Sequence, residues 1–443
     1  MTTLLGRTPS TAARAAPLRP EFRSGFAPLA GAAVLLTLAV ALAVPAESWQ
    51  GGWAETREHT HAAAVLLGIP LALAAGCRQG GRERRRGTGD LLETAVRGAL
   101  PRFLASAVPV ALWVAVGHLV AAGCALLATW YCATGDSPYV VVPLADSLLL
   151  GCAALGGQVV GRAVSWRLAA PVLATAGYAV LGFLSYDHDN AWSALSPLIG
   201  TSAGRVPVWW QPWVSVAWVG GLAAAAVLAL TARRRALALV PLVCATAAAV
   251  LLVQSGGPTR PVPVAGRQVC DTSTTPQVCV NARYGKLLPQ ITGALSGLTG
   301  RLEGVDNLPV RFEDRAGRPR ADEAELPMVV PLGWSVVRGR LTEPEQYAWE
   351  AGTALVGRAG CDGLDPAVAR TDAAVEHYLA PSPQEKHFDE LAAQGSPADR
   401  AELRAGQRAR ARLLGMAQDE RRAWLSEYFA TAGDCDPSGV PAL

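Results

Sequence analysis

RQGGRERRRGTGDLLETAVRGALPR, residues 78–102, lies between two long apolar runs and sets the topology of the chain. The segment holds seven arginines, which are Arg78, Arg82, Arg84, Arg85, Arg86, Arg97 and Arg102. Arginines crowded beside membrane-spanning runs mark the cytoplasmic side of the membrane. The segment is therefore predicted to be a cytoplasmic loop between two spans.

The second half of this loop has the pattern of a short amphipathic helix. Asp90 can cap its N-terminus, with Glu93 three residues later as the reciprocal partner of a capping box. Apolar residues then recur at helical spacing on one face, namely Leu91, Leu92, Ala95, Val96, Ala99 and Leu100. Pro101 is predicted to end the helix before the next span. The pattern indicates a helix lying on the inner membrane surface.

Composition divides the chain into two parts. The 443 residues are 51% apolar with a mean hydropathy of +0.24, and the apolar runs lie almost wholly before residue 254. Residues 1–253 hold 18 arginines and lysines against 11 acids, and residues 254–443 hold 21 against 25. The overall net charge of +3 argues against nucleic acid as a partner.

Seven apolar runs in the first part have the length of membrane spans. They are predicted at 26–44, 60–77, 103–132, 140–164, 168–185, from after Trp213 to about 230, and 236–253. Because more spans follow the first run, it is predicted to be an anchored helix and not a cleaved signal. The stretch 45–59, between the first two runs, is predicted to be an external loop.

The distribution of arginine predicts the orientation. Of the 18 arginines before residue 254, sixteen fall in the N-terminal tail or in the loops after spans two, four and six, and only Arg57 and Arg205 do not. The positive-inside rule therefore places residues 1–25 in the cytoplasm. With seven spans, residues 254–443 lie outside. The prediction is a multi-pass protein of the cell membrane.

The stretch between spans five and six, residues 186–213, is unusual for an external loop. It combines Asp187, His188 and Asp189 with a Ser-Pro break at 196–197, and it holds the tryptophans 209, 210 and 213. Tryptophan is favoured at the headgroup level, so part of this stretch is predicted to dip into the outer leaflet. The three polar residues could bind a cation, but a solvated loop is the favoured interpretation.

Cysteine usage agrees with an external second part. Cys77, Cys124, Cys132, Cys152 and Cys244 lie in or beside spans and are interpreted as small packing residues. The other four, Cys270, Cys279, Cys361 and Cys435, lie after residue 254. An even number of cysteines in an oxidising compartment favours disulfides. The short spacing suggests that Cys270 pairs with Cys279, which leaves Cys361 with Cys435, although other pairings and a zinc site stay open.

The second part is predicted to be an α+β domain. Strand-like runs occur at 267–270, 277–281, 308–313 and 328–337. A helix over 284–302 has one apolar side, formed by Leu287, Leu288, Ile291, Leu295, Leu298 and Leu302. From Glu343 onward the pattern is helical. The fold class is thus a mainly α membrane protein with seven transmembrane helices, followed by an extracytoplasmic α+β domain.

Motifs of catalysis are missing from the sequence. It contains no HExxH, Walker A or dinucleotide-binding motif. Glu376, His377 and His387 do not have the spacing of a zinc site, so these histidines are interpreted as solvated surface residues. No enzyme activity, metal or cofactor is predicted. Asp146 is an acidic residue at membrane depth, within span four, and is therefore a candidate functional residue. The alternative is a structural role, in which its side chain extends to the membrane surface or is hydrogen-bonded.

RRGTGDLLET, residues 85–94, followed by the Pro-Arg step at 101–102, resembles the cytoplasmic loop of ABC-2-type exporter membrane subunits. In that family, six spans carry an amphipathic coupling helix between the second and third, which rests on the ATPase. A partly embedded external segment lies between the fifth and sixth. The likeness covers residues 20–232, with 191–213 at the place of the embedded segment. The stretch VCDTSTTPQVCVNARYGKLLPQ is similar to external parts of actinobacterial membrane proteins of this kind.

The resemblance implies a six-span membrane domain over 26–232 with the coupling loop 78–102. An added span at 233–253 and an external domain at 254–443 depart from the family plan. The resemblance implies that the protein is a transporter, and specifically an exporter, that works with a separate cytoplasmic ABC ATPase. It also implies that the membrane subunits form a homo- or heterodimer in the lipid bilayer. The residues expected at the ATPase contact are Arg84, Arg85, Arg86, Asp90, Glu93 and Thr94. The alternative role of these arginines is to set the membrane topology and to bind lipid phosphates. The alternative function is a non-transporting scaffold or sensor whose external domain binds an envelope ligand or partner protein.

Overall fold

The chain forms two compact units. The computed structural model describes residues 22, 25–85, 98–133, 137–186, 191–198, 205–256, 259–314, 320, 322–329, 335–358, 361, 363–435 and 439–443. The first unit, called the membrane unit, comprises Met1–Ala46, Trp53–Tyr131 and Ser137–Val262. The second, called the C-terminal unit, comprises Glu47–Gly52, Cys132–Asp136 and Pro263–Leu443.

The membrane unit is a bundle of long apolar helices. They are α3 (Phe26–Ala43), α5 (Trp53–Ala63) continued through η1 (Ala64–Gly68) into α6 (Ile69–Gly80), α9 (Ala99–Trp130), α10 (Val141–Ala163), α11 (Ala169–Tyr186), α12 (Gln211–Thr231) and α13 (Leu239–Ser255). Within the described residues, six helices are long and apolar enough to cross a membrane. The fifth predicted span corresponds to α11, whose apolar stretch Ala169–Ser185 is shorter.

Two predicted boundaries of the bundle are wrong. The helix of the second span begins at Trp53 and not near residue 60, because the hydroxyl groups of Thr56 and Thr129 bond at 2.6 Å and the Arg57 side chain is buried. The amphipathic helix was predicted to end at Pro101, whereas α9 already begins at Ala99. Pro101 lies in the first turn of α9, where the N–H that proline lacks has no acceptor within the helix.

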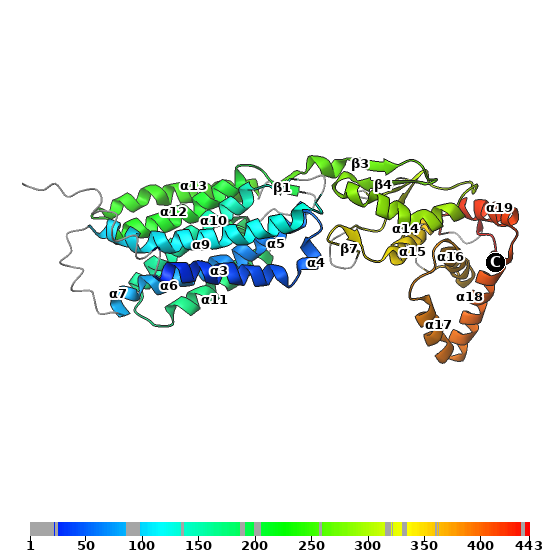
Figure 1. Ribbon diagram of the computed structural model, residues 1–443, viewed down its shortest axis with the longest axis horizontal. Coiled ribbons are helices and arrows are strands. Elements are labelled where there is room, and N and C mark those ends of the chain that lie inside the picture. Colours follow the sequence, from blue (N-terminus) through cyan, green and yellow to red (C-terminus); the bar gives the residue numbers. More distant parts are fainter. Residues whose placement is uncertain are drawn as a thin grey trace, which may run out of the picture. The chain divides into compact units, whose positions relative to one another are not determined.

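Helix α10 is the centre of the bundle. It packs against α6, α9 and α12, while α3 packs on α9, α11 on α6 and α13 on α12. Figure 1 shows these helices running side by side. Large apolar side chains remain exposed on their outer faces, such as Leu36 on α3, Phe183 on α11 and Val240 on α13. A surface this apolar suits a lipid surrounding.

Glycines bring α6 and α10 into backbone contact. Gly76 and Gly80 on α6 lie against the carbonyl groups of Ala154 and Gln158 on α10, and Gly157 and Gly161 on α10 lie against those of Leu73 and Cys77 on α6. A Cβ on Gly157 would lie 2.1 Å from the Leu73 carbonyl oxygen. Both helices thus present a GxxxG spacing, which lets membrane helices approach closely.

Shorter elements complete the membrane unit. They are α7 (Arg82–Arg85), η2 (Ala191–Leu195), β1 (Arg205–Pro207), η3 (Arg235–Ala238) and β2 (Thr259–Pro261), whereas α4 (Ala46–Trp49) falls mostly in the C-terminal unit. Strand β1 pairs antiparallel with β2, and Arg205 Nε donates to Thr259 Oγ1 at 2.6 Å. The segment that precedes α12 and the segment that follows α13 therefore lie at the same end of the bundle.

The C-terminal unit contains a four-stranded sheet. Its strands are β3 (Gln268–Asp271), β4 (Gln277–Asn281), β5 (Arg311–Glu313) and β6 (Glu323–Glu325), in that order. β3 and β4 are antiparallel, whereas β5 and β6 add in parallel. A separate two-stranded hairpin joins β7 (Val336–Val337) and β8 (Arg340–Leu341).

Three of the four predicted strand runs match this sheet, and the fourth does not. Of the described residues in the run predicted at 328–337, only those of β7 form a strand. The fourth strand of the sheet is β6 instead. Its three residues, Glu-Ala-Glu, are too short and too acidic for the hydrophobic pattern to detect.

Helices cover the sheet and close the unit. They are η4 (Pro263–Gly266), η5 (Ala282–Leu287), α14 (Leu288–Arg301), α15 (Pro344–Val356), α16 (Pro366–Leu379), α17 (Glu385–Gln394), α18 (Pro397–Gly415) and α19 (Gln418–Phe429). The apolar face predicted for α14 is confirmed, since Ile291, Leu295 and Leu298 are buried in one core with Phe312 of β5 and Tyr347 of α15.

Both disulfide pairs suggested by the sequence are present. Cys270 and Cys279 join β3 to β4, where they are directly opposite residues, and Cys361 is bonded to Cys435. The second bond closes a separation of 74 residues and ties the segment after α15 to the segment after α19. The zinc alternative is wrong for these four residues because their sulfur atoms are already bonded in pairs.

Candidate functional site in the membrane unit

A buried histidine–aspartate pair joins two helices of the bundle. His61, on α5, places its Nδ1 2.9 Å from both carboxylate oxygens of Asp146, on α10. The two residues are 6% and 2% exposed. Asp146 therefore does not extend to the bundle surface, and of the roles considered for it from the sequence, snorkelling is wrong.

The other nitrogen of the same ring holds a distant segment. His61 Nε2 lies 2.9 Å from the carbonyl oxygen of Pro197, in the stretch 191–198 between α11 and α12. Ala194 and Ser196 of this stretch are buried, and Leu198 packs against the core of the bundle. This part of the predicted external loop thus folds back into the membrane unit.

The partners of His61 restrict where protons can lie. A carbonyl oxygen only accepts hydrogen bonds, so His61 Nε2 carries a hydrogen. The contact with Asp146 needs one more proton, held either on Nδ1 or on the carboxyl group. An imidazolium beside a carboxylate and a neutral imidazole beside a carboxylic acid both satisfy this geometry. The shared proton can therefore shift between Nδ1 and the carboxyl group without loss of the hydrogen bond to Pro197.

A second buried histidine contacts α10 at Ser147, the residue that follows Asp146. His118, on α9, contacts the hydroxyl of Ser147 at 2.8 Å through Nδ1, and that hydroxyl donates to the Pro143 carbonyl at 2.7 Å. Nδ1 is consequently the donor, and Nε2 is an acceptor. Among the described residues, this buried Nε2 has no hydrogen-bond partner.

A small cavity adjoins His61 and Asp146. Its volume is about 10 Å³, room for about one water molecule. Pro197, Gln211 and Ser215 also line it, so α12 contributes polar side chains to the same place. The arrangement leaves room for a water molecule between α5, α10, α12 and the returning segment.

The structure describes only some of the other residues proposed for function. Arg84 and Arg85 lie in α7 and are exposed, and each guanidinium donates to a backbone carbonyl, Arg84 to that of Arg162 and Arg85 to that of Arg78. Arg86, Asp90, Glu93 and Thr94 lie outside the described residues, as do Asp187, His188 and Asp189.

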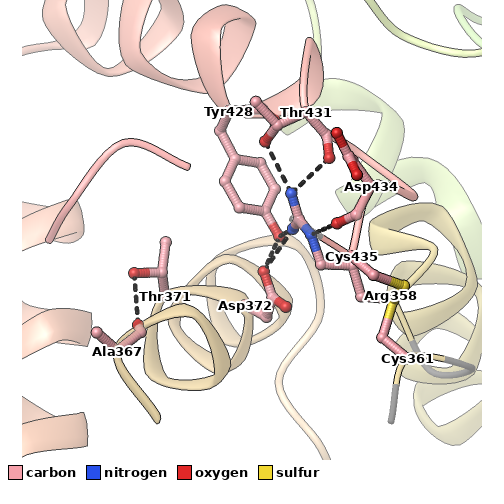
Figure 2. Close-up of polar contacts among 9 residues, drawn as sticks. All are labelled: Arg358, Cys361, Ala367, Thr371, Asp372, Tyr428, Thr431, Asp434 and Cys435. Carbon is pink, nitrogen blue, oxygen red and sulfur yellow. Dashed lines mark hydrogen bonds and ion pairs between the residues drawn. A yellow bond between two sulfur atoms is a disulfide. The ribbon is translucent and has the colours of Figure 1, made fainter. Parts of the chain in front are cut away.

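The C-terminal unit contains a different buried cluster, centred on Arg358 (Figure 2). The guanidinium donates to Asp372 at 2.7 Å, Tyr428 at 3.2 Å, the carbonyl and hydroxyl of Thr431 at 2.6 and 2.7 Å, and the Asp434 carbonyl at 3.0 Å. These five hydrogen bonds use all of its N–H groups.

This cluster has the features of a structural clamp. The Tyr428 hydroxyl also donates to Asp372 at 2.6 Å, and burial raises the pKa of that hydroxyl above its usual range. The neighbouring disulfide Cys361–Cys435 closes the same region, as Figure 2 shows. With each donor satisfied, the guanidinium has no hydrogen bond left to offer a ligand.

The histidine at 377 is not the solvated residue that the sequence suggested. His377 Nδ1 contacts Glu385 at 2.8 Å, and Glu385 also pairs with Arg410. His387 is exposed as predicted. Across the part of the chain that the structure describes, no three histidine, cysteine or acidic side chains come together in a way that could hold a metal ion.

The sequence indicated Asp146 as a candidate, but neither its partner His61 nor His118, which contacts Ser147, was predicted. His61 and His118 lie 85 and 28 residues before Asp146 in the chain, and His61 falls within a run that reads as a span. A histidine inside an apolar span is the signal that could have found them. Comparisons of the chain with protein-family models, with curated proteins and with solved structures find no match.

Proposed function

We propose that the chain is the membrane-spanning subunit of an ABC-2-type transporter, an exporter, that works with a separate cytoplasmic ATPase. The observation that carries the proposal is the segment 191–198, which returns into the bundle between α11 and α12 and is held by His61 through Pro197. This is where the family plan has its partly embedded segment. The order of the helices before and after it agrees with that plan.

In the proposed topology α11 is the fifth of seven spans and the N-terminus is cytoplasmic. The arginine-rich segments 78–102, 162–167 and 233–235 then share the inner side. The pairing of β1 with β2 agrees with this, because it brings together two segments that the topology assigns to the outer side. The C-terminal unit lies outside, an assignment supported by its two disulfides.

Helix α10 supplies a mechanical link in this proposal. At its inner end the carbonyl of Arg162 accepts a hydrogen bond from Arg84 of the coupling loop, and near its outer end Asp146 binds His61. A helix of 23 residues is about 34 Å long and moves as one rod. ATP-driven movement of the loop would shift α10, break the contact with His61 and release the segment 191–198. Two such subunits, identical or different, would enclose the path.

The first test is purification of the tagged full chain from its own host in a gentle detergent, with mass spectrometry of the co-purifying chains. A stoichiometric ATPase with a Walker A motif is expected. Glu93→Lys in the coupling loop should abolish its retention, whereas the same charge reversal at the exposed Glu390 of α17 should not. Retention of the ATPase by Glu93→Lys would remove the coupling assignment.

A second variant tests the outer part of the mechanism. His61→Phe removes both hydrogen bonds of the ring while keeping a similar volume. We expect the ATPase to stay bound and its turnover to become independent of transport. His59→Phe, two residues earlier on α5, is the matched control because His59 bonds the Glu55 carbonyl within its own helix. Equal behaviour of the two variants would contradict the proposed role of His61.

The alternative function, a non-transporting scaffold or sensor, has one observation in its favour. α17 and α18 pack on each other and expose Phe388, Leu391 and Leu414, each more than half exposed. Exposed apolar side chains of this size suit a protein partner. Co-purification of an envelope protein held through residues 254–443, with no ATPase, would favour this function over transport.

A further inference from the structure

An arginine-lined cavity lies at the arginine-rich end of the bundle and shares no lining residue with the cavity beside His61 and Asp146. Its volume is about 550 Å³. Arg78 at the end of α6, Arg84 and Arg85 of α7, and Arg167 before α11 all line it. Among the described residues that line it, none is acidic. The fold thus gathers four cations from three segments around one space.

The arginines are positioned without being neutralised. Arg85 donates to the Arg78 carbonyl, Arg84 donates to the Arg162 carbonyl, and the Arg78 guanidinium lies 5.2 Å from the centre of the Phe26 ring. Each of these contacts directs a guanidinium while leaving its charge in place. Within the described residues, none of the four forms an ion pair. Like charges held close together repel each other, so the cavity is suited to an anion.

The rim of the cavity points to a particular kind of anion. Trp166 and Val164 line it and are 55% and 41% exposed, and Pro171 of α11 lines it as well. Tryptophan beside arginine at the end of a helical bundle is the composition of a headgroup-level site. A charged centre with an apolar border suits a molecule that has both parts.

We propose that this cavity binds the phosphate of an anionic membrane lipid. Guanidinium groups bind phosphate oxygens through paired charge-assisted hydrogen bonds. The headgroup would be held by Arg84, Arg85 and Arg167, and its acyl chains would leave along Trp166 and Pro171. A bound lipid would also bridge α7, in the coupling loop, to the start of α11. The inference does not depend on an ATPase partner.

Native mass spectrometry of the full-length protein in detergent tests this site. The probes are phosphatidylglycerol and phosphatidylcholine with the same acyl chains, added at equal concentration. We expect the protein to retain phosphatidylglycerol at least about tenfold more strongly, because the choline of phosphatidylcholine adds a cation that the arginines repel. Arg84→Gln/Arg167→Gln should abolish the preference.

Control variants separate the site from general charge. Arg233→Gln/Arg234→Gln removes two exposed arginines outside the cavity and should keep the preference. Arg167→Lys keeps the charge but not the paired hydrogen bonds, so its preference for phosphatidylglycerol should be intermediate. This variant replaces the double variant as the test if Arg84→Gln/Arg167→Gln does not fold. An unchanged preference in folded Arg84→Gln/Arg167→Gln, or a preference lost equally in both double variants, would overturn the proposal.

Inorganic phosphate distinguishes the two sources of the same chemical group. A lipid held by both its headgroup and its chains should stay bound in millimolar phosphate. If inorganic phosphate displaces phosphatidylglycerol and stabilises the protein alone, the site takes free phosphate and the lipid assignment is wrong.

Discussion

The two units each bury a base against an acid, and they satisfy these groups differently. In the C-terminal unit, all N–H groups of Arg358 have an acceptor, and Asp372 is shared with Tyr428. In the membrane unit, His61 and Asp146 adjoin a cavity of about 10 Å³, and His118 Nε2 has no hydrogen-bond partner among the described residues. A complete network stabilises one structure, whereas an incomplete one can still accept a proton.

Glycine shows the same contrast. On α6 and α10, four glycines are contact points where a Cβ would meet a backbone carbonyl, namely Gly76, Gly80, Gly157 and Gly161. On α14 the glycines at 293, 297 and 300 are exposed, and a Cβ added to any of them would meet nothing within 4 Å. Identical residues thus have opposite consequences, because in one unit two helices touch at the glycine and in the other no neighbouring atom of the chain lies near it.

The largest expected effect breaks the clamp of the C-terminal unit. Arg358→Met should lower the free energy of unfolding of this unit by about 3–5 kcal/mol, because Asp372 stays buried without its cation. Denaturant unfolding of the full chain, followed by protection of the C-terminal unit from protease, measures the loss. Arg340→Met, at an exposed position of β8, should change stability by less than about 0.5 kcal/mol. Similar losses in both variants would show that the hydrogen bonds of Arg358 do not stabilise the C-terminal unit.

The next effect concerns Glu376, one turn beyond Asp372 on α16. Burial and the charge of Asp372 raise the pKa of Glu376 to about 7. The folded state then keeps a proton that the unfolded state loses near pH 4.5, so stability falls as pH rises from about 4.5 to about 7 and is constant above. The change is about 3 kcal/mol. Unfolding measured from pH 4.5 to 8 should show this slope in the wild type, and a slope that persists in Glu376→Gln would exclude Glu376 as its origin.

A smaller effect tests the helix contact in the membrane unit. Gly157→Ala should destabilise the bundle by about 1–3 kcal/mol, because the new methyl group pushes α10 away from the Leu73 carbonyl of α6. Gly156→Ala, on the same helix, meets no atom within 4 Å and should be neutral or slightly stabilising. Thermal unfolding of both variants in detergent compares them directly. Equal melting temperatures would contradict the close packing of α6 and α10.

The smallest effect has the opposite sign. Gly293→Ala or Gly297→Ala should each stabilise the C-terminal unit by about 0.5–1 kcal/mol, because alanine is a better helix former and its methyl group meets open space. Denaturant midpoints of the full chain measure the gain. Destabilisation in these variants would indicate that another surface covers this face of α14 in solution.

Much of the architecture could be predicted from local patterns. The long apolar runs predicted the helices of the membrane unit, and the spacing of Ile291, Leu295 and Leu298 predicted the buried face of α14. The nine-residue separation of Cys270 and Cys279 suggested a disulfide that the pairing of β3 with β4 explains. The run at 328–337 was only partly correct, because among its described residues the strand is limited to Val336–Val337 and Met328 is exposed.

On its own, the sequence determined which stretches are apolar enough to cross a membrane, where arginine accumulates, and that Asp146 lies within a span. These properties depend on residues that are neighbours in the chain. Only the tertiary structure decided that His61 meets Asp146 across 85 residues and also holds Pro197, and that four arginines from three segments line one cavity. Such contacts depend on how helices pack, and packing is set by the volumes and glycines of several segments at once, which no single segment encodes.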